Sequence, residues 1–176
     1  MSRLNCLYGL ALLGAVSAVH ADDAMIAWPG GWQIQPQPSM SKPGGGDARR
    51  ERAVKNDAGG NPLMVVELTR TTLQPGHQVN LQAVLLEMRR AVQFNFSHGG
   101  YQSRCTPIHD SLLGDLPAVE TTCEIQLDGG HVLTQTLVAA AQQSTAYSLS
   151  YAGSADGYEA TEDEVMGIRR ELKLLR

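Results

Sequence analysis

The chain has 176 residues, of which 43% are hydrophobic, and its formal net charge is −4 at pH 7. This length suits one domain with one sizeable core, and the composition is that of a globular protein, which argues against a disordered chain or a membrane bundle. The acidic net charge and the lack of a long Lys/Arg block argue against nucleic-acid binding as the main role.

The first 21 residues have the pattern of an export signal. Arg3 supplies a short positive region, residues 7–16 are apolar but too few to span a bilayer, and Val19-His20-Ala21 resembles a cleavage site. A buried N-terminal helix is the alternative, which the acidic residues after Ala21 disfavour. We therefore predict cleavage after Ala21 and a periplasmic or secreted chain of residues 22–176 with no transmembrane segment. Because Cys6 precedes the apolar run, no lipid anchor is expected.

The mature chain retains two cysteines, Cys105 and Cys123, on two candidate strands. They lie at about equal distances from Leu113-Gly114-Asp115, where a turn would fold one strand back on the other. Opposed residues of an antiparallel pair come within disulfide reach. An even cysteine count in an exported protein favours a disulfide, and a redox pair lacks its C-x-x-C spacing. We predict a structural bridge in a hairpin around which the sheet is built.

Hydrophobic periodicity predicts a single α+β domain over residues 22–176. Residues 63–69 are a nearly continuous apolar run, which predicts a central strand. Residues 119–127 alternate between apolar and polar side chains, which predicts a strand with one face exposed to water. A helix is expected over 81–92, and a second one after Thr161, which would form a capping box with Glu164. With shorter strands elsewhere, the prediction is a mostly antiparallel sheet of five to seven strands with two main helices packed on it.

Residues 36–60 are rich in Gly, Pro and charge, which predicts a flexible loop with at most a short strand near 52–55. Arg49, Arg50 and Arg52 cluster within it. Trp28 and Trp32 are the only tryptophans. They could stack a ligand, or at least one of them could plug the end of the sheet.

No catalytic motif is present. The mature chain has four histidines, none at a zinc-binding spacing, so we expect no metal and no cofactor. No serine lies in a nucleophile elbow. We expect no enzyme; a small hydrolase would require a deep pocket in which His109 or His131 meets an acid and a hydroxyl group.

The order of elements resembles the PsbP-like α/β/α sandwich group, which includes the DcrB-type exported bacterial proteins. The resemblance is carried by Pro29-Gly30-Gly31-Trp32-Gln33-Ile34, by the 81–92 helix, and by Tyr147-Ser148-Leu149-Ser150-Tyr151 followed by Tyr158 and the last helix. It implies an accessory, assembly or binding module and no shared catalytic residues. The two cysteines are not part of the resemblance.

We therefore expect an exported, non-enzymatic binding or accessory module that acts on a protein or a small ligand in the periplasm. The alternative is a secreted immunity or inhibitor protein directed against a toxin or hydrolase. A concave apolar cavity would favour a small ligand, and a flat exposed patch a protein partner. The expected contact residues lie in the basic loop and at the aromatic ends of the sheet: Trp28, Trp32, Arg49, Arg50, Arg52, Tyr101 and Tyr158.

Overall fold

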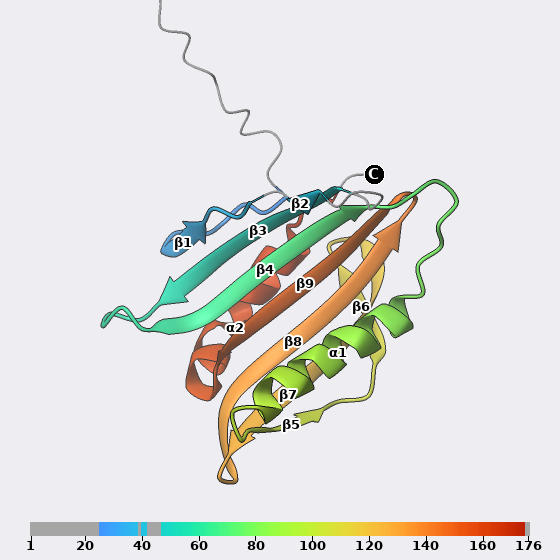
Figure 1. Ribbon diagram of the computed structural model, residues 1–176. Helices are drawn as coiled ribbons and strands as arrows, with labels where there is room; N and C mark the ends of the chain where they lie inside the picture. Colours follow the sequence, from blue (N-terminus) through green and yellow to red (C-terminus); the bar gives the residue numbers. More distant parts are fainter. Residues whose placement is uncertain (1–24, 39, 42–46, 175–176) are drawn as a thin grey trace, which may run out of the picture.

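The computed structural model describes residues 25–38, 40–41 and 47–174, which form one antiparallel sheet with a helix on each face (Figure 1). The predicted signal peptide and its cleavage site lie outside the described residues. The strands are β1 (Trp32–Gln35), β2 (Met40–Ser41), β3 (Asp47–Asn56), β4 (Pro62–Thr72), β5 (Gln102–Cys105), β6 (His109–Leu113), β7 (Leu116–Leu127), β8 (Gly130–Gln142) and β9 (Thr145–Ser154); the helices are α1 (Leu81–Ser97) and α2 (Ala155–Arg170).

The α+β fold class is confirmed, with more strands than predicted. The described residues contain nine strands in the order β1-β3-β4-β9-β8-β7-β5, with β2 also paired to β3 and β6 also paired to β7. The sheet is therefore seven strands wide. Nine strands fit in this width because β1 and β2 both pair with β3 at one edge, and β5 and β6 both pair with β7 at the other.

The strand β8 is apolar and buried on both of its faces over residues 137–140. In β8, Val138 and Ala140 face the core under α2, whereas Leu137 and Ala139 face the core under α1, and all four are buried. Alternate residues of a strand point to opposite faces, so a strand that is apolar at every position needs cover on both. The two helices provide that cover: α1 over β7 and β8, and α2 over β4, β9 and β8.

The disulfide joins Cys105 to Cys123, which are directly paired between β5 and β7, and their Cα atoms are 3.9 Å apart. Cys123 is fully buried under α1. The turn between β6 and β7 contains Gly114 with φ of +57°, as the predicted reversal requires. The hairpin itself lies at one edge of the sheet, however, and β9 and β8 occupy its centre. The prediction that the sheet is built around the hairpin is therefore wrong.

The predicted flexible loop at 36–60 is also wrong over Asp47–Asn56, which is a ten-residue strand where at most a short one near 52–55 was expected. β3 pairs with β4 from Ala48 to Asn56. Its arginines gain carboxylate partners from across the sheet, such as Glu67 on β4. Composition indicated a loop because those partners lie outside the local sequence. Residues 42–46 of the predicted loop lie outside the described residues.

The start of α2 also corrects a prediction, because the helix begins at Ala155 and Ser154 is its N-cap. The Ser154 hydroxyl accepts a hydrogen bond from the Gly157 N–H at 3.1 Å. A Cβ on Gly153 or Gly157 would come within 2.5 Å of the Leu63 carbonyl oxygen. These glycines thus allow β9 and α2 to approach β4 closely, whereas the sequence pattern had suggested a break before a helix capped by Thr161.

Replacing Leu85 by Ala should destabilise the fold by about 2–5 kcal/mol, because Leu85 is fully buried between α1 and the sheet. Chemical denaturation measures this difference. The matched control is Val84→Ala on the same helix, where the side chain is 39% exposed and the change should stay within about 0.5 kcal/mol. Equal losses in the two variants would show that α1 is not part of the core.

Candidate functional site

The first described residues are fixed in place by β3 and by the end of the chain. The Glu51 carboxylate accepts hydrogen bonds from the backbone N–H groups of Met25, at 2.9 Å, and Ile26, at 3.1 Å. The Lys173 N–H donates to the Met25 carbonyl at 3.0 Å. Met25 and Ile26 are both buried. This clamp positions the next aromatic residue, Trp28, at the β1 edge of the sheet.

A cavity of about 680 Å³ lies between this segment, the end of β1 and β3. We call it the edge groove. Its lining residues come from three short stretches of the chain: Ile26, Trp28, Ile34, Gln35, Pro36, Gln37, Arg49, Arg50, Glu51 and Arg52. Ile34 is 63% exposed, although it belongs to a strand. The edge groove therefore combines an apolar wall with three guanidinium groups and one carboxylate.

The arginines of the edge groove are held by acidic neighbours. Arg52 Nη1 lies 3.4 Å from Glu67 Oε2, and its Nε donates to the Gln35 side chain at 2.9 Å. Arg50 Nε lies 3.2 Å from the other oxygen of the same carboxylate, and Arg49 lies 3.6 Å from Glu51. These pairs are partly exposed, so they fix the side chains without contributing much stability.

The two tryptophans have different roles. Their ring centroids are 5.7 Å apart. Trp32 is 8% exposed and donates its indole N–H to Glu164 on α2 at 2.9 Å, so it plugs the end of the core. Trp28 is half-buried, packs against it and lines the edge groove. The interpretation as a plug is therefore confirmed for Trp32, and ligand stacking by Trp28 stays a prediction.

The other predicted contact residues lie in different parts of the structure. Arg49, Arg50 and Arg52 join Trp28 in the edge groove. Tyr101 lies elsewhere, packed edge-on against Phe96 at the end of α1 with centroids 5.8 Å apart. Tyr158 stacks on Tyr151, its hydroxyl lies 2.7 Å from Thr136 Oγ1, and burial raises its pKa. The two tyrosines therefore belong to the packing of the domain.

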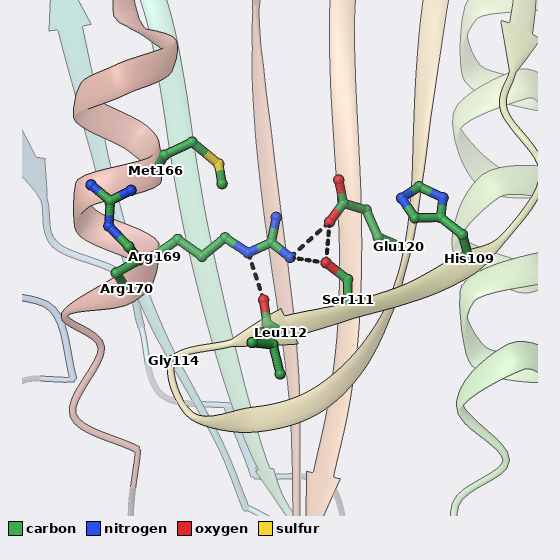
Figure 2. Close-up of a pocket in the computed structure, with 8 residues that line it drawn as sticks. All are labelled: His109, Ser111, Leu112, Gly114, Glu120, Met166, Arg169 and Arg170. Carbon is green, nitrogen blue, oxygen red and sulfur yellow. Dashed lines mark hydrogen bonds and ion pairs between the residues drawn. The ribbon is translucent and has the colours of Figure 1, made fainter.

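A second cavity, which sequence reasoning missed, lies between the β6–β7 hairpin and the last turns of α2 (Figure 2). Its volume is about 480 Å³, and we call it the hairpin cavity. Arg169 crosses its base and is only 4% exposed. The Arg169 side chain donates to the Leu112 carbonyl at 2.7 Å and to Ser111 Oγ, and it pairs with Glu120 at 2.7 Å.

Ser111 donates its hydroxyl proton to Glu120 Oε2 at 2.7 Å, so a serine and a carboxylate meet inside this cavity. The same oxygen also faces the Arg169 guanidinium. Among the described contacts, none joins His109 to Ser111 or Glu120; its ring nitrogen lies 3.2 Å from the Pro107 carbonyl. The pocket that a hydrolase would need is present, but a histidine–acid–hydroxyl chain is not formed.

The network around Arg169 extends into the core. Its Nη1 lies 3.4 Å from the Tyr151 hydroxyl, and burial, followed by the charge of Glu120, raises the pKa of Tyr151. Within the described part of the chain, no three potential metal ligands gather, and no helix is long and apolar enough to cross a membrane.

A family model matches residues 23–174, almost the whole described chain. The protein belongs to the family described as Domain of unknown function (DUF4946). A search of curated proteins finds no match.

The fold is similar to the solution structure of cyanobacterial PsbP (CyanoP) from Synechocystis sp. PCC 6803, with a TM-score of 0.58. The alignment covers 84% of each chain at 9% identity. At this identity the likeness shows the fold alone, and it confirms the PsbP-like resemblance at that level.

Replacing Arg169 by Met should destabilise the protein by about 2–4 kcal/mol, because the buried guanidinium bonds the Leu112 carbonyl and Ser111 and pairs with the partly buried Glu120 carboxylate, which would all lose this partner. Thermal and chemical unfolding measure the loss. The double variant R169M/E120Q should recover part of it. The neighbouring Arg170 is exposed, so Arg170→Met is the matched control and should change stability by less than about 0.5 kcal/mol.

Glu164 should make part of the stability depend on pH. Its pKa is lowered below the ordinary 4.5, first by the hydrogen bond from Lys55 and also by the bond from Trp32. A lowered pKa in the folded state adds stability above 4.5, and this contribution is lost as the pH falls through and below that value.

Glu164→Gln should therefore be less stable than the parent near neutral pH, by no more than about 1 kcal/mol because the carboxylate is 42% exposed. The difference should shrink on acidification, measured by urea unfolding at a series of pH values. A difference that stays constant with pH would contradict the assignment.

Proposed function

We propose that this protein is an exported, non-enzymatic binding module and that the edge groove holds its ligand. The predicted signal peptide supports export. The Cys105–Cys123 disulfide supports the periplasm or another oxidising compartment, since such bonds persist there. Binding or accessory roles are also what the PsbP-like resemblance implies, and this remains an analogy.

The observation that carries the proposal is the composition of the edge groove. Trp28 and Ile34 offer apolar surface to a ligand, and Arg49 and Arg52 offer guanidinium groups beside it. Small-ligand sites are concave, largely apolar and supplied with a few polar groups that fix orientation, and a volume of about 680 Å³ falls within their usual range. We infer an amphipathic ligand with an anionic group, because guanidinium recognises carboxylate, sulfonate or phosphate oxygens in pairs.

The shape of the groove also favours a small ligand over the inhibitor alternative. A protein that neutralises a toxin would present a flat or protruding surface, whereas the candidate residues here border a concavity. Glu51 is engaged by Met25, Ile26 and Arg49, so its charge is offset and it does not oppose an anion strongly.

The test uses the mature chain, residues 22–176, and anilinonaphthalene sulfonate, an amphipathic anion whose fluorescence rises on burial. We expect saturable binding that also quenches emission from Trp28. Ile34→Asp should weaken binding at least about tenfold, because it places a negative charge on the apolar wall. Phe94→Asp on α1 is the matched control, since Phe94 is 64% exposed and Ile34 is 63% exposed, and Phe94 does not line the edge groove.

Circular dichroism should show that both variants are folded. Equal affinity in the two variants, whether retained or lost, would show that the probe binds elsewhere and would reject the edge groove as the ligand site.

A further inference from the structure

One row of side chains on the sheet places two arginines directly opposite each other. Arg49 of β3 is paired with Arg70 of β4, and Arg70 is paired with Tyr147 of β9. These three strands are neighbours in the sheet (Figure 1). Directly opposed side chains lie on one face about 4.5–5.5 Å apart at Cβ, and like charges in this position are destabilising. A negative group between the two guanidinium groups would remove this penalty.

The row lies on the face of the sheet that α2 covers. Tyr147 belongs to the core under α2, as does Leu68. Arg70 follows Leu68 by two residues on β4, so its side chain points to the same face. Tyr147 is only 2% exposed, Arg70 is partly buried, and the Arg49 side chain is 42% exposed. The row therefore runs from the core to the solvent and is open at its Arg49 end.

Two polar atoms of the row are buried without a hydrogen bond. Nε of Arg70 and the hydroxyl group of Tyr147 are both shielded from solvent, and neither has a partner in the described part of the chain. Buried polar groups in native proteins are nearly always hydrogen-bonded, and an exception requires an explanation such as a bound ion. Arg70 can only donate, and the phenolic O–H can donate as well. One acceptor placed between the two side chains would satisfy both atoms.

The carboxylates on this face are not paired with Arg70. Glu51, two residues after Arg49 on β3, accepts from two backbone N–H groups and lies 3.6 Å from Arg49. Asp47 lies on the same face at the start of β3. Among the described contacts, none joins Arg70 to Glu51 or to Asp47. The positive charge of Arg70 is therefore available to an anion from solution.

We propose that Arg49, Arg70 and Tyr147 bind a tetrahedral oxyanion, that is, a phosphate or sulfate group. Each guanidinium can donate two parallel N–H bonds to such an anion, and the hydroxyl group can donate one more. A carboxylate has only two oxygens for three donor side chains. The site shares Arg49 with the edge groove, but Arg70 and Tyr147 do not line that groove. The inference therefore does not rest on the function proposed for the groove.

The experiment measures the melting temperature of the mature chain, residues 22–176, in sodium phosphate, sulfate, acetate or chloride at one ionic strength. Phosphate and sulfate also stabilise proteins by exclusion from the surface, so the shift must be compared between variants. In the parent chain, about 50 mM phosphate or sulfate should raise the melting temperature at least about 2 °C above the chloride value, which corresponds to a dissociation constant of about 10 mM or tighter. Acetate should give less than about half of this shift.

Arg70→Gln should lose most of the shift and should be at least as stable as the parent in chloride, because the like-charge contact is removed. Tyr147→Phe should weaken phosphate binding at least about threefold, through the loss of one hydrogen bond. Arg89→Gln is the matched control and should keep the full shift. Arg89 also has a buried Nε without a described partner, but it lies on α1, on the other face of the sheet.

Three results would each overturn the proposal. The first is a parent chain that phosphate and sulfate stabilise no more than chloride does. The second is a shift in acetate as large as the shift in phosphate. The third is a shift that Arg70→Gln or Tyr147→Phe retains as fully as Arg89→Gln does, because the stabilisation would then come from exclusion of the salt and not from a bound anion.

Discussion

The constraint on which this structure depends is β8, a strand of the sheet that is buried and apolar on both faces over residues 137–140. Val138 and Ala140 of β8 lie under α2, and Leu137 and Ala139 lie under α1. Exposing either apolar face to water would be unfavourable, so one helix must pack on each side. The long antiparallel registers from β4 through β9 and β8 to β7 bring those faces together. The layered fold shared with cyanobacterial PsbP follows from this requirement.

The edge groove and the hairpin cavity both lie at edges of the sheet, where the short strands β1 and β6 pair with longer neighbours. At the β1 edge, the clamp on Met25 and Ile26 positions Trp28 over β3. At the β6 edge, Arg169 ties α2 to the hairpin. Each cavity thus has a floor fixed by a charged residue that reaches between elements far apart in the sequence.

Buried charge has a structural role at both places. Glu51 and Arg169 each satisfy backbone groups that would otherwise lack partners in a buried setting: two N–H groups for the first and the Leu112 carbonyl for the second. Such residues determine the geometry of a site without being free to bind a ligand themselves. In the edge groove, the apolar surface that remains available to a ligand belongs to their neighbours Ile34 and Trp28.

Local patterns in the sequence determined much of the architecture. The stripe that includes Leu85 and Val92 specified α1, the alternation from Val119 to Leu127 specified β7, and the spacing around Gly114 brought Cys105 opposite Cys123. These features depend on neighbours within about twenty residues, which a single sequence displays.

Tertiary contacts determined the features that local sequence patterns did not predict. Asp47–Asn56 is a strand because β4 lies beside it and supplies Glu67, and no composition rule contains that information. Glu164 accepts a hydrogen bond from Trp32 and pairs with Lys55 instead of capping a helix, because the fold places these residues of β1 and β3 beside its side chain. The hairpin cavity unites β6 with α2, which are more than forty residues apart, around an arginine whose burial could not be read locally. A sequence records periodicity and spacing, whereas the partner of a charged side chain depends on which distant segments the fold places beside it.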